Sequence, residues 1–146
     1  MTQLLATDNS WTGLVLRLTV GIVLFPHATQ KMFGWFNGPG LSGEMKFMTG
    51  PAGLPVFIAI LAIIIECAGM AMLLAGVGTR VAAMGIFVLF TGMISFHWKN
   101  GFFMNWFGKL PAGQEGFEYH LLVLGICIVL FIVGGGRYSV DQWLTD

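Results

Sequence analysis

The sequence has few charged residues, and this shortage limits what the protein can be. Only 10% of its 146 residues are Asp, Glu, Lys or Arg, against about a quarter in an ordinary soluble domain. Such a chain cannot cover its own surface with polar groups, so a lipid bilayer is its natural solvent. Seven basic residues balance seven acidic ones and form no basic patch, which argues against a nucleic-acid partner.

Cysteine is also scarce. Cys67 and Cys127 both lie inside apolar segments, and neither belongs to a CxxC motif. The sequence therefore indicates neither a disulfide framework nor a thiolate metal site. A free cysteine in such surroundings behaves as a small buried hydrophobic residue.

Long apolar segments dominate the rest of the chain, which is 56% hydrophobic. A membrane-spanning helix needs about 20 mostly apolar residues, and open strands would leave backbone groups unpaired in lipid. The sequence predicts an all-α, multi-pass membrane protein, a single domain over residues 1–146 with four transmembrane helices in a bundle. The expected spans are residues 11–33, 54–77, 81–97 and 117–133.

The connections between these spans differ in length. A tight turn, GVGTR, joins the second span to the third, whereas the other two connections are long and rich in aromatic residues and glycine. With four spans, both aromatic loops lie on one side of the membrane and both termini on the other. The first loop is expected to hold a short helix over residues 43–49, capped by Ser42.

Polar residues gather near the loop-side ends of the spans. At about 1.5 Å per residue, they fall in one layer close to that boundary. Hydrocarbon penalises them unless they face the interior of the bundle, so the sequence predicts a polar pocket roofed by the aromatic loops. The residues of this layer are His27, Gln30, Lys31, His97, Glu118 and His120.

Two opposite charges lie deeper in the first two spans. Arg17 and Glu66 differ in depth by about 6 Å, within reach of two long side chains. A lone charge at mid-bilayer costs about 2.5–3.5 kcal/mol, so an Arg17–Glu66 ion pair is expected. It would act either as a clamp that fixes helix register or as a functional contact.

The sequence leaves three interpretations of the predicted pocket open. A quinone-type ligand would receive hydrogen bonds from His, Gln and Lys, a proton route from a carboxylate, and aromatic walls from the loops. A metal ion on the histidines and Glu118, or a haem, is conceivable but has no sequential motif behind it. In the third interpretation, the pocket binds no ligand and its polar side chains hold the four helices together.

Three stretches carry a resemblance to a known family: LRLTVGIVLFPHATQKMFGWFNGPGL, ECAGMAMLLAGVGTRVAA and GRYSVDQW. Between Leu16 and Trp143, the chain resembles the DoxX family of small bacterial membrane proteins. The positions that match the family pattern are Arg17, His27, Gln30, Lys31, Gly34, Trp35, Gly40, Glu66, Gly69, Gly76, Thr79, Arg80, His97, Glu118 and Gly136–Ser139.

The resemblance implies four transmembrane helices, a bacterial inner (cytoplasmic) membrane and cytoplasmic termini. The family name comes from an association with an archaeal terminal quinol oxidase and with thiosulfate:quinone oxidoreduction. Other members are linked to membrane complexes that handle thiol and oxidative stress.

The leading hypothesis is a membrane subunit of a respiratory or redox system, possessing a quinone-binding pocket and belonging to a quinone-linked oxidoreductase. In the alternative, a non-catalytic scaffold recruits a redox protein through its aromatic loops, and self-association is open in either case. In the first hypothesis, His27 and His97 donate hydrogen bonds to the ligand, and Glu118 and His120 relay protons. The ligand-binding residues would be Gln30, Lys31, Trp35 and Trp106, with Arg17–Glu66 as the pocket floor.

Overall fold

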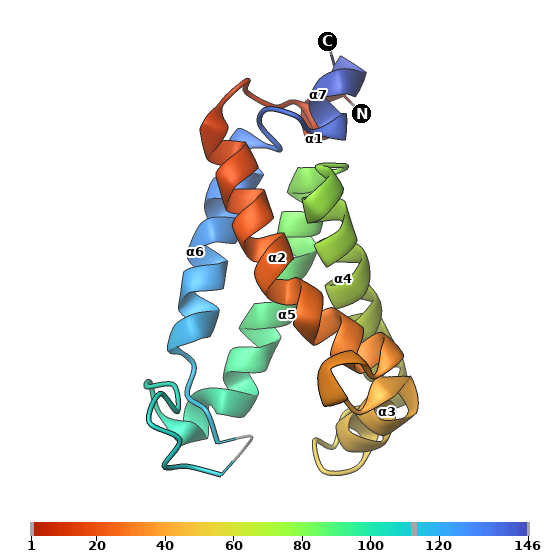
Figure 1. Cartoon of the computed structure of the whole chain (residues 1–146), viewed down its shortest axis with the longest axis vertical. Coiled ribbons are helices and arrows are strands. Elements are labelled where there is room, and N and C mark those ends of the chain that lie inside the picture. The colour runs from red at the N-terminus through yellow and green to blue at the C-terminus, as the bar shows by residue number, and fades with distance from the viewer. Residues whose placement is uncertain (1, 112–113, 146) are drawn as a thin grey trace.

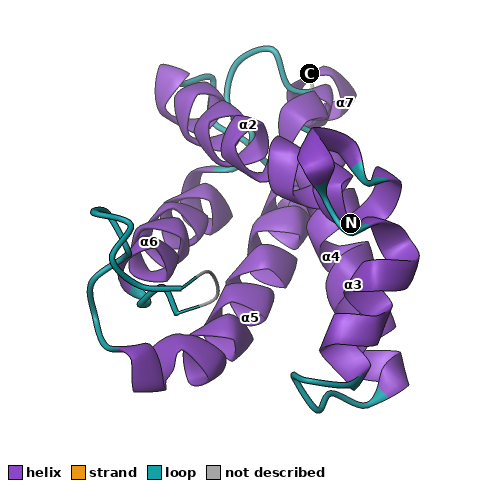
Figure 2. Ribbon diagram, turned by 60° about the horizontal axis from the view of Figure 1, so that its bottom comes forward, coloured by secondary structure: helices purple, strands orange, loops and turns teal. Residues whose placement is uncertain are grey.

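The computed structural model describes residues 2–111 and 114–145, and the regular structure of this part is entirely helical (Figure 1, Figure 2). The predicted all-α class is therefore confirmed. Four long helices form the bundle: α2 (Trp11–Phe33), α4 (Val56–Ala75), α5 (Thr79–His97) and α6 (Glu118–Val133). Their bounds lie within two residues of the predicted spans.

Short helices flank these four. Near the termini lie α1 (Thr2–Leu5) and α7 (Val140–Thr145), and the connections contain η1 (Trp35–Asn37), α3 (Gly40–Thr49) and η2 (Trp98–Asn100). Helix α3 is the short helix expected in the first loop. It begins three residues earlier than expected and Pro39 occupies its N-cap, so the predicted Ser42 cap is wrong.

Three helices, α2, α4 and the segment that starts with α5, are long and apolar enough to cross a membrane. Helix α6 is apolar but has 16 residues. At 1.5 Å per residue it is about 24 Å long, shorter than a hydrocarbon core of about 30 Å. Three spans are thus supported by length, and the fourth stays a prediction.

The bundle has two unlike ends. Figure 1 shows both termini, α1 and α7 at one end, and α3 with the loop before α6 at the other. We call these the terminal end and the loop end. The pair α2–α4 and the pair α5–α6 diverge toward the loop end (Figure 1). Apolar side chains from all four helices form the buried core: Val20, Leu24, Leu73, Ile86, Phe90, Val123 and Leu130.

Arg17 of α2 holds the terminal end together. Its side chain is 2% exposed, and each nitrogen of the guanidinium group donates to backbone carbonyls. Two of these carbonyls belong to the last turn of α4 and three to the segment after α6. The acceptors are the oxygens of Leu73, Leu74, Gly135, Arg137 and Tyr138, at 2.8–3.3 Å.

The position of Arg17 follows from the needs of a helix end. The last carbonyls of a helix lack intrahelical donors and carry the negative end of the helix dipole. An arginine provides five N–H donors in a planar fork. One side chain therefore satisfies the end of α4 and the chain leaving α6 where water is excluded.

Asp141 does the same for the start of α5. Its two carboxylate oxygens accept from the backbone N–H groups of Gly78 and Thr79, at 2.6 and 2.8 Å. Close backbone packing supports this arrangement, because a Cβ atom on Gly13 would lie 2.6 Å from the nitrogen of Gly136. The terminal end is thus closed by α7 and by the glycine segment after α6.

The Arg17 contacts predict a large effect for a conservative change. In Arg17→Lys, an ammonium group has three donors and no fork, so at least two charged hydrogen bonds are lost, at a cost of about 3 kcal/mol. We expect a clear fall in the melting temperature, measured by circular dichroism in detergent. Arg80→Lys is the control, because within residues 2–111 and 114–145 the Arg80 side chain makes one hydrogen bond, to the Ile132 carbonyl. An equal loss in both variants would contradict the assignment.

Candidate functional site

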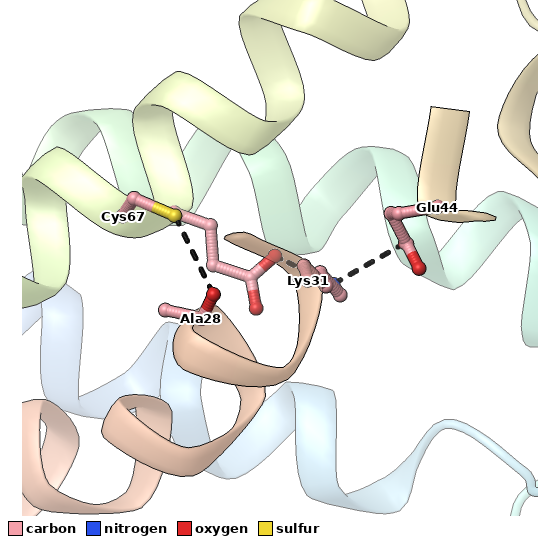
Figure 3. A network of polar contacts seen from close by, with 5 residues as sticks. Ala28, Lys31, Glu44 and Cys67 are labelled. Atoms are coloured by element: carbon pink, nitrogen blue, oxygen red, sulfur yellow. Dashed lines mark hydrogen bonds and ion pairs between the residues drawn. The ribbon is translucent and has the colours of Figure 1, made fainter. Parts of the chain in front are cut away.

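Lys31 lies in the last turn of α2 and brings three helices together. Its Nζ atom is 2.6 Å from Oε2 of Glu66 on α4 and 4.0 Å from Oε1 of Glu44 on α3 (Figure 3). The three side chains are 4–17% exposed, with Glu66 the most deeply buried. We call Lys31, Glu44 and Glu66 the charged cluster.

The end of α2 determines where Lys31 lies. The helix ends at Gly34, which has the left-handed backbone conformation (φ 73°), and the Gly34 N–H bonds the carbonyl of Gln30. The chain then turns into α3, which carries Glu44 back over α2. The glycine-rich segment after the first span therefore completes the charged cluster.

The charged cluster holds two carboxylates and one ammonium group. Burial raises the pKa of Glu44; the ammonium of Lys31 opposes this shift, and the carboxylate of Glu66 adds to it. Lys31 therefore neutralises the carboxylate of Glu66, at 2.6 Å, more completely than that of Glu44, at 4.0 Å. As a result, Glu44 takes up a proton more readily than an ordinary glutamate does.

Cys67 follows Glu66 on α4 and helps to align the two helices. Its Sγ atom lies 3.7 Å from the carbonyl oxygen of Ala28, to which the thiol donates (Figure 3). Ala28 is 1% exposed, and its small side chain permits α2 and α4 to approach. Both cysteines are free thiols.

The predicted Arg17–Glu66 ion pair is wrong. Glu66 pairs with Lys31, at 2.6 Å, while Arg17 bonds to backbone carbonyls at the terminal end. Both residues are buried as expected. Residue spacing gives the depth of a side chain along its helix but not its partner. It could not show that Arg17 bonds the carbonyls at the end of α4, or that Lys31 extends inward to Glu66.

A second polar group lies between α5 and α6. The rings of His97 and His120 have centroids 4.8 Å apart, and Phe90 packs on His120 at 5.4 Å. Nδ1 of His97 is 2.8 Å from the carbonyl oxygen of Glu115. A carbonyl oxygen can only accept, so this contact fixes a proton on His97 Nδ1.

Two buried polar atoms on α6 have no hydrogen-bond partner among the described residues. They are the hydroxyl of Tyr119 and Nδ1 of His120. The rings of these two residues are 5.9 Å apart. An unsatisfied buried polar group costs about 1–3 kcal/mol, so these atoms are candidates for contact with a ligand. The sequence reading overlooked Tyr119, whose only signal was its place beside His120 in the first turn of a span.

Glu118 is already bonded in the structure. One carboxylate oxygen accepts from the indole N–H of Trp106, at 2.7 Å, and the other from the backbone N–H of Met104, at 3.3 Å. Glu118 therefore ties the second aromatic loop to the start of α6. Trp106 itself is 71% exposed.

The remaining predicted site residues lie on or after α2. The amide of Gln30 donates to the carbonyl of Phe36, at 3.3 Å, and so fixes the chain after the helix. Trp35 packs on the rings of Phe25 and Phe33. His27 is exposed, so the expected convergence of all three histidines is not found and only His97 and His120 meet.

A metal ion or an apolar ligand would each need a different kind of site. In residues 2–111 and 114–145, no three His, Cys, Asp or Glu side chains are grouped so that they could hold a metal ion. An apolar hollow of about 130 Å³ lies between α5 and α6 and includes Phe87, Cys127 and Phe131 in its lining. None of the predicted site residues lines it.

The Lys31–Glu66 contact predicts strong coupling between the two side chains. Breaking a buried pair costs about 3–5 kcal/mol because one charge is left alone, whereas replacing both partners by apolar residues is often close to neutral. We expect Lys31→Met to be more destabilising than the double change Lys31→Met/Glu66→Met, measured by chemical unfolding in detergent. Lys46→Met, an exposed change on α3, is the matched control.

The raised pKa of Glu44 predicts a pH-dependent stability. The stabilising contribution of Glu44 to folding is complete below the ordinary pKa of glutamate. It is lost as the pH rises through the raised pKa that Glu44 has in the folded protein. Glu44→Gln keeps a neutral side chain throughout, so its melting temperature should exceed that of the wild type increasingly with rising pH. Thermal scans from about pH 4 to about pH 8 test this; a similar trend in Glu115→Gln would contradict it.

A comparison with protein-family models matches residues 13–98 to the DoxX family. No curated protein and no solved structure gives a significant match. The match covers nearly all of α2 and the whole of α3, α4 and α5, and so includes the whole charged cluster. With its long apolar helices, the chain is a membrane protein and belongs to the DoxX family.

Proposed function

We propose that this membrane protein binds a quinone-like ligand at the loop end of the bundle, as a subunit of a redox system. The observation that carries the proposal is the pair of buried polar atoms on α6, Tyr119 Oη and His120 Nδ1, that lack a partner in the described chain. Folding leaves such groups unpaired only at a cost. A ligand oxygen between them would recover that cost.

The chemistry of these two atoms suits a quinone head group. A quinone offers carbonyl oxygens that accept hydrogen bonds, while a phenol hydroxyl and an imidazole N–H both donate. The adjacent Phe90 ring, 5.4 Å from His120, provides an apolar wall. The ring of His97 packs against that of His120 at a tilt of 37°, and His97 Nδ1 is anchored on the carbonyl oxygen of Glu115.

The charged cluster would supply electrostatic stabilisation and protons to the same region. Lys31 would favour an anionic reduced ring, and Glu44 on α3 would exchange protons with the water at the loop end. A partner protein would supply or remove the electrons. In this proposal, Glu118 and Trp106 hold the loop, and a catalytic role for His27 stays a prediction.

The proposed setting is a bacterial inner membrane with four spans and cytoplasmic termini. Helix α6 packs along α5 and exposes an apolar surface, as a fourth span would require. Arg17, Arg80 and Arg137 belong to the terminal end, which favours the cytoplasm under the positive-inside rule. Lysines on the loop side weaken that preference, so orientation rests mainly on the family expectation.

A second function is favoured by exposed aromatic rings at the loop end. Trp35, Phe36, Trp106 and Phe107 are 53–85% exposed in the isolated chain. Aromatic side chains are enriched where proteins associate. The protein would then recruit a redox partner through these loops without binding a quinone.

Tyr119→Phe separates the two functions. Removing one hydrogen bond to the ligand should raise the quinone dissociation constant about tenfold. The same change removes an unsatisfied buried hydroxyl, so the stability of the free protein should stay equal or rise by up to about 1 kcal/mol. Quinone titration and thermal unfolding in detergent measure the two quantities.

Tyr138→Phe is the matched control, because it removes the other tyrosine hydroxyl, which lies at the terminal end. It should leave quinone affinity unchanged. No measurable quinone binding by the wild type would refute the ligand proposal. If Trp106→Ala then abolished capture of a redox partner, the scaffold function would replace it.

A further inference from the structure

A polar hollow of about 250 Å³ opens at the terminal end of the bundle. It is lined by Asn9, Arg137, Tyr138 and Gln142. These residues come from the segment before α2, the segment after α6 and the C-terminal helix α7. None of them belongs to the charged cluster or to the proposed quinone site.

The side chains of this hollow present donors, because their acceptors are already used. The amide oxygen of Asn9 accepts from Nε of Arg137, at 3.0 Å. The amide oxygen of Gln142 accepts from the backbone N–H of Tyr138, at 3.1 Å. Each amide therefore keeps its NH₂ group, which has no partner in the described residues. A lining of donors without a carboxylate is suited to an anion.

Arg137 supplies the positive charge. Its backbone N–H bonds the Ser10 carbonyl, and its guanidinium lies over the ring of Trp11, 5.1 Å from the centroid. Nε is held by Asn9, whereas the two terminal nitrogens have no hydrogen-bond partner within residues 2–111 and 114–145. By contrast, all three nitrogens of Arg17 are bonded. Arg137 is thus positioned by the protein and still able to bind a ligand bidentately.

Tyr138 has a strained backbone in the same place. Its φ of 55° lies in the left-handed region, which is unfavourable for a bulky residue. The carbonyl of Tyr138 accepts from Arg17, at 2.8 Å, and its N–H donates to Gln142. The Arg17 network therefore holds the hollow in shape, and such strain is often found at ligand sites.

We propose that this hollow binds the phosphate of an anionic phospholipid headgroup. The hollow adjoins the first residue of α2, at the level where a span enters the interface. Exposed aromatic side chains surround it, with Trp11 at 56%, Tyr138 at 75% and Trp143 at 79% exposure, as in the aromatic belt at a membrane surface. The donor lining accommodates a phosphate but offers no carboxylate for the ammonium group of a zwitterionic lipid.

Native mass spectrometry of the whole protein in detergent tests this site with phosphatidylglycerol, phosphatidylcholine and inorganic phosphate as probes. We expect phosphatidylglycerol to bind at least about tenfold more tightly than phosphatidylcholine, and millimolar phosphate to compete weakly. Gln142→Glu keeps the acceptor for the Tyr138 N–H but replaces the donor by a negative charge. It should weaken phosphatidylglycerol binding about tenfold.

Gln114→Glu is the matched control, since it makes the same change at an exposed position of the opposite end. Asn9→Asp is the second variant, because it keeps the acceptor for Arg137 Nε and removes the free NH₂ group. Equal retention of the two lipids, or equal effects of Gln142→Glu and Gln114→Glu, would overturn the proposal. Full displacement of the lipid by inorganic phosphate would assign the hollow to a free anion and would also overturn it.

Discussion

The guanidinium group of Arg17 is the contact on which the terminal end of the structure depends. It joins the end of α4 to the segment after α6 through backbone carbonyls that come from positions 56 to 121 residues away in the sequence. In a bilayer these carbonyls would have no water to bond. The arginine removes that cost at a single point. Because it bonds backbone rather than a side-chain partner, its position is fixed by the geometry of a helix end and not by another charge.

The other buried ionisable groups are stabilised in different ways. Asp141 accepts backbone N–H groups at the start of α5, and Lys31 forms an ion pair with Glu66. At the terminal end, every carboxylate oxygen and guanidinium nitrogen of Arg17 and Asp141 is bonded. At the loop end, Tyr119 and His120 each retain a buried atom with no partner in the part of the chain that the structure describes, and Glu44 is incompletely neutralised. The two buried charges of the terminal end, Arg17 and Asp141, are therefore fully bonded, although Thr79 Oγ1 and Arg80 Nε there have no partner among the described residues. The loop end combines unpaired buried atoms with an incompletely neutralised carboxylate.

This division limits where each kind of ligand fits. In the proposed function, a neutral acceptor such as a quinone carbonyl would bind the two buried polar atoms of α6 that lack a partner among the described residues. A phosphate matches the exposed cationic hollow beside Arg137, where the headgroups of a bilayer would lie. Both proposed sites lie at ends of α6, since Tyr119 and His120 belong to its first turn and Arg137 follows its last residue. The functional groups thus rest on structure that the apolar helices already provide.

The sequence by itself determined the helices, because unbroken apolar runs of span length admit no other backbone in lipid. It also identified Arg17, Lys31, Glu66, His97 and His120 as residues in need of partners, since their burial is costly. It could not assign those partners: helix rotation and the divergence of the two helix pairs are set by packing between segments far apart in the chain. Only the tertiary structure paired Glu66 with Lys31, turned His27 outward, brought His97 beside His120 and folded Asp141 onto α5. Depth along a helix is a property of sequence spacing, whereas direction around its axis is decided by the neighbours it packs against.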